Sequence, residues 1–165
     1  MFELKPISQE GIPVALEKAV RYRLLNEPAL AESICLDILR IDPENQEALV
    51  TLLLSLTDQL GAGGVASQAK AVIPRLKGEY ERAYYSGIIC ERAAKSLLDH
   101  AGPGSAFGAY DGFREAMEWY EAAEPLRPAG SDDAVLRWNT CVRILKKYPN
   151  LRPRPEESFE PVLGE

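Results

Sequence analysis

Residues 31–45, AESICLDILRIDPEN, share one spacing with residues 116–130, AMEWYEAAEPLRPAG. In each stretch a small residue is followed four, seven and twelve positions later by a larger apolar residue, another apolar residue and a proline. Steps of four and three place side chains on one helix face, and proline ends a helix because it lacks the N–H donor. The spacing therefore predicts two equivalent helices, with stripes and stops at Ala31, Cys35, Ile38 and Pro43, and at Ala116, Tyr120, Ala123 and Pro128.

Two further series of positions repeat every 34 residues. They are Ala19, Leu53 and Gly87, and Tyr22, Leu56 and Cys90. Together with the two proline-terminated helices, this period resembles the tetratricopeptide repeat (TPR), whose second helix carries A-x3-F and a later proline. The step from Ala19 to Tyr22 resembles the G-x2-Y of the first helix, where a small residue lets the paired helix approach, although Leu53 is not small and Cys90 is not aromatic.

The resemblance to small bacterial-type TPR proteins implies an all-α fold, a right-handed α-α superhelix of about three TPR-like helix pairs plus a C-terminal closing helix. We expect an N-terminal lead-in at 1–11, a helical domain at 12–147 with an irregular insertion at about 97–111, and an extended proline-rich tail at 148–165. Asn45 and Ser105 are candidate N-caps, as is the run Ser131-Asp132-Asp133. The last helix should bury Val135, Trp138, Val142 and Leu145 and keep a polar outer face.

Composition agrees with a globular protein. The chain has 165 residues, of which 46% are apolar and 27% charged, with a formal charge of −6, which argues against disorder. It has neither a run of about 18 apolar residues nor a signal-peptide pattern at its start. We therefore expect a cytoplasmic protein with no membrane insertion, and the three separated cysteines, Cys35, Cys90 and Cys141, as reduced core thiols.

The sequence has few of the residues that catalytic and metal-binding motifs need. His100 is the single histidine and has no cysteine or histidine partner at ligand spacing. The glycine cluster Gly61, Gly63 and Gly64 lacks the lysine and hydroxyl of a phosphate-binding loop. We expect a protein that is not an enzyme, with no cofactor and no metal; an enzyme using the insertion around His100 is the weakest alternative.

A binding role is better supported. The resemblance implies a concave groove lined by the first helix of each pair, suited to a partner peptide or helix. In this chain the implied partner-binding residues are Leu16, Val20, Arg23, Val50, Leu54, Tyr84, Ile88, Arg137, Thr140 and Arg143. Members of the family that grip a C-terminal carboxylate use cationic residues and asparagine where this chain has Leu16, Val20 and Thr51, so we do not expect that clamp.

Charge suggests where a partner would lie. Residues 134–155 contain six cations and no acid, so one hypothesis is that this end attracts an acidic segment. The other is a solvated closing helix with cations favoured at its C-terminus. The leading interpretation is a non-catalytic adaptor or scaffold that binds another protein and no nucleic acid. A cytosolic secretion-type chaperone is the main alternative, and a homodimer or a tail lying in the groove stays open.

Overall fold

The chain folds into helices. The computed structural model describes residues 1–61, 64–100 and 102–156, and over these ranges it contains seven α-helices, three short 3-10 turns and no strand. The helices are α1 (Ile12–Leu24), α2 (Pro28–Ile41), α3 (Gln46–Thr57), α4 (Val65–Val72), α5 (Glu79–Asp99), α6 (Ser105–Ala123) and α7 (Asp133–Lys147). This confirms the predicted all-α class.

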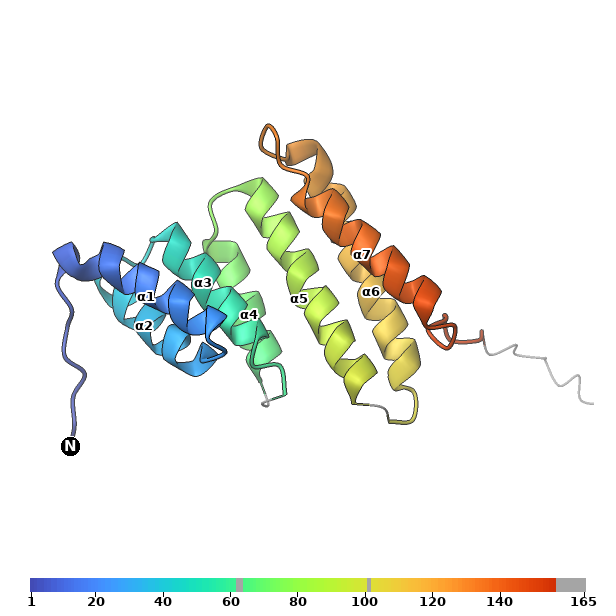
Figure 1. Cartoon of the computed structure of the whole chain (residues 1–165), viewed down its shortest axis with the longest axis horizontal. Coiled ribbons are helices and arrows are strands. Elements are labelled where there is room, and N and C mark those ends of the chain that lie inside the picture. Colours follow the sequence, from blue (N-terminus) through green and yellow to red (C-terminus); the bar gives the residue numbers. More distant parts are fainter. Residues whose placement is uncertain (62–63, 101, 157–165) are drawn as a thin grey trace, which may run out of the picture.

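The helices form a row along the long axis of the molecule, from α1 and α2 at one end to α6 and α7 at the other (Figure 1). Consecutive helices pack as hairpins, α1 with α2, α3 with α4, and α5 with α6, and α7 packs on α6. The first helices of neighbouring pairs also contact each other, α1 with α3 and α3 with α5. Both relations are those of stacked helix pairs.

The two stripes predicted from the sequence face the core. Ala31, Cys35 and Ile38 of α2 each have 0% exposure, as do the corresponding Ala116, Tyr120 and Ala123 of α6. Helix α2 ends at Ile41, ahead of Pro43, and α6 gives way at Ala123 to a 3-10 turn, Glu124–Leu126, that contains Pro125. The prediction of two equivalent helices is confirmed.

Small residues set the closest approach of α5 to α6. A Cβ added to Gly87 would overlap the ring of Tyr120, and one added to Gly112 would lie 2.9 Å from the Cβ of Ala94. Gly87 stands in the 34-residue series with Ala19 and Leu53, which are both fully buried. The small residue thus has the role that the repeat pattern predicts for it.

Two hydrophobic clusters divide the core. One is built mainly from α1 to α4 and the other from α5 to α7. Leu54 of α3 and Tyr85 of α5 pack against both clusters, so the row is one continuous body of packed side chains.

No helix in the described ranges combines the length and the apolar composition of a membrane-spanning segment.

The expected irregular insertion at about 97–111 is mostly helical. Helix α5 runs to Asp99 and α6 begins at Ser105, since the buried stripe of α6 starts early, with Ala109 and Phe113 at 0% exposure. Ser105 is not the N-cap, because that position is Gly104, whose φ of 79° is left-handed and suits glycine.

Two other predicted caps have different outcomes. Asn45 caps α3 as predicted, because its Oδ1 accepts a hydrogen bond from the N–H of Ala48 at 2.9 Å. Asp132 occupies the N-cap position of α7 but makes no side-chain capping bond. The expected acidic first turn of α7 is present as Asp133.

The described chain after α7 is anchored to the domain. Leu151 is only 5% exposed and packs in the α5–α7 cluster, and the Arg154 guanidinium lies 5.5 Å from the centre of the Phe107 ring. The first part of the predicted extended tail is thus held against the domain, because the large apolar side chain of Leu151 packs in the core. The rest of the predicted tail, 157–165, lies outside the described residues.

We expect Gly87→Ala to lower the free energy of unfolding by about 1–3 kcal/mol, since the added methyl group must displace the buried ring of Tyr120. The matched control is Gly108→Ala in α6, where the new Cβ meets only the Leu97 Cδ1 atom at 3.4 Å. That change should be neutral or stabilising by about 0.5–1 kcal/mol, because alanine favours helix. Urea unfolding followed by circular dichroism measures both, and equal effects would contradict the close-approach argument.

Candidate binding surface

Helices α1, α3 and α5 together form an apolar hollow of about 1060 Å³. We call it the apolar hollow; its lining residues are Ile12, Pro13, Leu16, Glu17, Val20, Arg21, Leu24, Asn45, Gln46, Glu47, Val50, Thr51, Glu81 and Tyr85. Val20 is 46% exposed and Leu24 is 80% exposed. Helix α1 therefore presents exposed apolar side chains to a concavity that α3 and α5 also line.

The rim of the apolar hollow is acidic. Glu17, Glu47 and Glu81 line it together with a single cation, Arg21, and Glu17, Glu47 and Arg21 are exposed. In water these charges act mainly on the approach and orientation of a ligand, whereas burial of apolar surface supplies most of the affinity. The rim therefore favours ligands that carry positive charge beside apolar groups.

Tyr85 forms the inner wall of the apolar hollow where α5 lines it. Its ring is half-buried and makes an edge contact with Tyr84, with centroids 5.1 Å apart. Burial, and to a smaller extent the neighbouring Tyr84, raise the pKa of Tyr85 to about 12. Its phenol is thus neutral at physiological pH and acts as an amphipathic contact surface.

A second, polar hollow of about 600 Å³ lies further along α3 and α5. We call it the polar hollow; it is lined by Thr57, Asp58, Gln59, Leu60, Gly61, Glu91, Arg92, Lys95, Ser96, Asp99, His100 and Arg137. Charges of both signs line it, and Asp58, Arg92, Glu91 and Arg137 are held in ion pairs.

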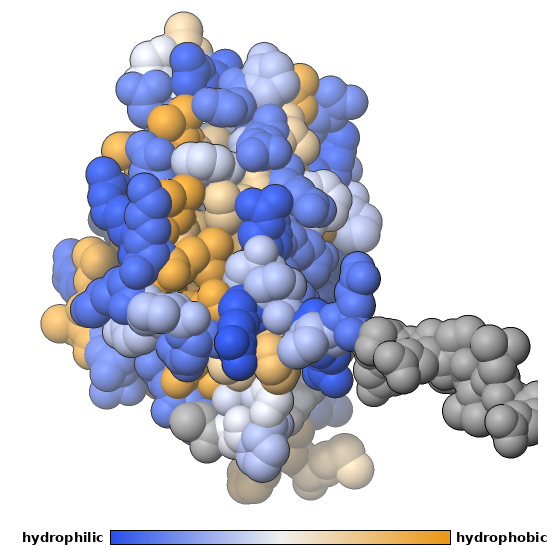
Figure 2. All heavy atoms as spheres, turned by 90° about the vertical axis from the view of Figure 1, so that its right-hand side faces the viewer, coloured by the Kyte–Doolittle hydropathy of each residue, from blue (hydrophilic) through white to orange (hydrophobic). Residues whose placement is uncertain are grey.

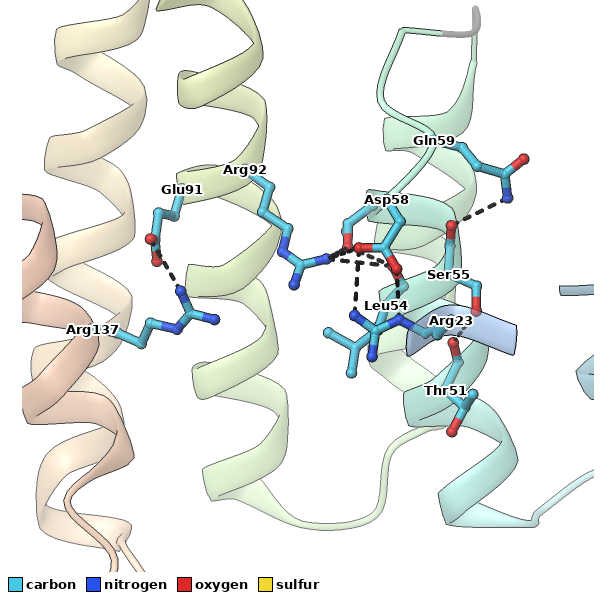
Figure 3. A network of polar contacts seen from close by, with 10 residues as sticks. Arg23, Thr51, Leu54, Ser55, Asp58, Gln59, Glu91, Arg92 and Arg137 are labelled. Carbon is cyan, nitrogen blue, oxygen red and sulfur yellow. Dashed lines mark hydrogen bonds and ion pairs between the residues drawn. The ribbon is translucent and has the colours of Figure 1, made fainter. Parts of the chain in front are cut away.

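Asp58, at the end of α3, links three first helices (Figure 3). Its Oδ2 accepts from the Arg23 Nε of α1 at 2.6 Å, and its Oδ1 accepts from the Arg92 Nη1 of α5 at 2.5 Å. The same Arg92 nitrogen donates to the Thr57 Oγ1 at 2.6 Å. The three charged side chains are 22–25% exposed, so this cluster is screened less than a surface pair and orients α1, α3 and α5.

Glu91 of α5 is a buried carboxylate that links α5 to α6 and α7. It is 1% exposed, and its Oε2 accepts from the Tyr120 hydroxyl at 2.6 Å. Its Oε1 accepts from the Arg137 Nη1 at 3.3 Å, a contact that Figure 3 shows. Burial and the charge of Glu91 both raise the pKa of Tyr120. Burial lowers the pKa of Arg137, but the charge of Glu91 and its other neighbours raise it by more, so Arg137 stays charged.

Nucleophiles and metal ligands are not assembled in the described ranges. No group of three histidine, cysteine or acidic side chains there could hold a metal ion. Burial raises the pKa of Cys35 and Cys141 to about 12 and that of Cys90 to about 11, so their thiols stay protonated. His100 is exposed, with its Nδ1 atom 2.8 Å from the carbonyl oxygen of Ser96.

The ten predicted binding residues separate into groups. Leu16, Val20 and Val50 line the apolar hollow. Arg23 and Arg137 are held by carboxylates. Arg143 is exposed and makes no ion pair within the described part of the chain. The structure thus brings together Leu16, Val20 and Val50 and separates them from the two paired arginines.

The other four predicted residues contribute little free surface. Leu54 is half-buried between the two core clusters, and Tyr84 stacks on Tyr80 with ring centroids 5.6 Å apart. The Thr140 hydroxyl donates to the carbonyl oxygen of Leu136 at 2.9 Å. Ile88 is 1% exposed and lies in the core, so its prediction as a groove residue is corrected: it lies on the side of α5 that packs into the α5–α7 cluster.

Sequence reasoning missed Leu24, Tyr85 and the acidic rim. Tyr85 lies between the two predicted positions Tyr84 and Ile88, so a small error in the helical phase of α5 accounts for its omission. Arg92 was missed as well, although it follows Asp58 by 34 residues, which is the repeat period. That coincidence of charge and period is a signal that could have found the pair.

Comparisons of this chain with protein-family models, with curated proteins and with solved structures gave no match.

We expect Glu91→Gln to lower the free energy of unfolding by about 1–3 kcal/mol, the range for losing hydrogen bonds to a charged group, discounted because the Arg137 side chain is 36% exposed. The neutral amide removes the ion pair and leaves the buried part of Arg137 without its countercharge. Glu118→Gln, on the exposed face of α6, is the control and should stay within about 0.5 kcal/mol. Thermal and urea unfolding of both variants provide the measurement, and a Glu91 variant as stable as the control would argue against this role.

Proposed function

We propose that this protein is a non-catalytic, cytoplasmic adaptor of the TPR type that binds a segment of another protein in the apolar hollow. The observation that carries the proposal is the hollow itself: exposed apolar side chains of α1, with α3 and α5 beside them, surround a concavity of about 1060 Å³. Concave, largely apolar surfaces with a few polar groups are the usual binding sites of proteins. The helix hairpins and the 34-residue series support the assignment to the TPR type.

The chemistry of the hollow favours one kind of segment. Apolar anchors would fill the space around Leu16, Val20 and Val50, as the face of an amphipathic helix does in a groove. Basic residues beside those anchors would face Glu17 and Glu47 on the rim. The partner is therefore an amphipathic segment with large apolar side chains flanked by lysine or arginine.

The hypothesis of an acidic partner at the C-terminal end is tested at Arg143 alone and not at Arg137. Arg137 holds the buried Glu91, so reversing its charge would disturb the core as well as a partner. Arg143 is exposed and is the residue with which that hypothesis is tested. Under the leading proposal, we expect Arg143→Glu to leave binding in the apolar hollow unchanged.

The main test selects ligands without assuming a partner. Random helical and linear peptides displayed on phage are selected for binding to the whole protein. The dissociation constants of the selected peptides are then measured by fluorescence anisotropy. We expect selected peptides to carry two or more large apolar residues with neighbouring lysine or arginine. Val20→Asp should weaken them about tenfold or more, because it places a charge against the apolar anchor.

Val14→Asp is the matched control for this test. Val14 is 56% exposed on the same helix but is not part of the apolar hollow, so its change should alter binding by less than about threefold, as expected for a distant surface site. Equal loss in both variants, or none in either, would rule out the hollow as the binding site. Circular dichroism of both variants shows whether the fold is kept.

The acidic rim makes a separate prediction. The double change Glu17→Lys and Glu47→Lys should weaken the selected basic peptides and reverse the effect of salt, so that added salt no longer weakens binding. Titrations at low and high ionic strength measure this. If the double variant binds these peptides as the parent does, the rim has no part in partner choice.

A further inference from the structure

The end of the row formed by α6 and α7 carries an apolar strip. Figure 2, which looks onto this end, shows apolar side chains gathered in a band between hydrophilic flanks. The apolar residues of α7 that follow steps of three and four and are only half-buried are Val135, Trp138, Val142 and Leu145. The Trp138 Nε1 atom donates to the Glu121 Oε1 of α6 at 3.0 Å, which places this stripe at the seam between α6 and α7.

This strip corrects an expectation about the closing helix. The sequence predicted that these four residues would be buried. It also predicted a polar outer face for α7, which the exposed Arg143, Lys146 and Lys147 form. The four residues of the stripe are half-buried instead, because no helix of the described chain packs beyond α7 in the row (Figure 1). A stack of helix pairs needs some cover over its last pair.

The chain beyond α7 returns to one end of this seam. After α7 ends at Lys147, Leu151 inserts into the core and Arg154 lies over the ring of Phe107. Phe107 belongs to the first turn of α6. The described chain, which ends at residue 156, is therefore held where α7 ends and α6 begins.

The sequence of the last nine residues combines apolar side chains with acidic ones. Residues 157–165 read ESFEPVLGE, with the apolar side chains of Phe159, Val162 and Leu163 between three glutamates. Nine extended residues reach up to about 30 Å, whereas the 15 residues of α7 span about 22 Å. The segment is long enough to cover the strip from one end to the other.

The two sides of the strip carry exposed charges of opposite sign. The last turns of α7 present the exposed cations Arg143, Lys146 and Lys147, and 134–155 contains no acid. The outer face of α6 presents Glu118 and Glu121, which are exposed and would repel an acidic segment. The acidic segment is therefore attracted to the α7 side of the seam.

We propose that residues 157–165 dock within the same molecule along the apolar strip between α6 and α7. Phe159, Val162 and Leu163 are the anchors that cover Val142 and its neighbours on the stripe, and the glutamates face the cations of α7. Tethering at Leu151 and Arg154 keeps the segment at high local concentration, so modest contacts suffice. The inference concerns a different surface from the apolar hollow and does not rest on the proposed function.

The test uses the full chain with two changes in the segment, Phe159→Asp and Leu163→Asp. Hydrogen–deuterium exchange should become about tenfold or more faster in the amides of α7, because two large apolar contacts are lost. A fluorescein-labelled ESFEPVLGE peptide should bind this variant saturably and bind the parent at least about tenfold more weakly, since the parent's own segment occupies the strip. The control is Ser158→Asp, which adds a charge in the same segment without removing an anchor.

A charge swap provides a second, independent readout. Lys146→Glu with Lys147→Glu should also speed exchange in α7, and adding Glu157→Lys with Glu160→Lys should restore the parental rate. Unchanged exchange in the anchor variant, or no rescue by the swap, overturns the proposal. A parent that elutes as a dimer and becomes monomeric in the anchor variant, measured by light scattering, also overturns it, because the segment would then dock on a second copy.

Discussion

The buried carboxylate of Glu91 is the interaction on which the C-terminal half of the structure depends. A charge at 1% exposure is tolerated only where hydrogen bonds and a countercharge replace the lost water. Tyr120 of α6 and Arg137 of α7 supply them, so the position of one side chain on α5 determines how two other helices sit. Asp58 has the corresponding role for α1, α3 and α5, at partial exposure and with two arginines.

Both carboxylates lie on the side where the first helices face one another, and this limits what that side can bind. Arg92 and Arg137, which a ligand would meet in the polar hollow, are already paired with Asp58 and Glu91 (Figure 3). A ligand group that competed for them would have to break contacts that hold the row together. In the apolar hollow, by contrast, the exposed side chains of Val20 and Leu24 make no ion pair that holds helices together. The same surface therefore separates into a part that holds the fold and a part free to bind.

Close packing of α5 on α6 makes the Glu91 contact reachable. The missing side chain at Gly87 leaves room for the ring of Tyr120, whose hydroxyl then meets the carboxylate one helical turn further along α5. The length of these two helices also determines how the row ends. Helix α6 continues back to Ser105 and brings Phe107 beside Arg154 in the chain that follows α7.

The helices, their order and their buried stripes follow from the sequence alone, because helical periodicity and proline stops are local properties of the chain. Ala31, Cys35 and Ile38, with their counterparts on α6, were predictable for that reason, whereas Leu16, Val20 and Val50 were implied by the resemblance to the repeat family. The tertiary structure decided what depends on contacts between helices: that Ile88 is buried, that Arg137 is held by Glu91, and that Leu151 anchors the chain after α7. It also decided that Tyr85 and three glutamates from three helices surround one hollow, since residues so far apart in sequence meet only when the pairs stack.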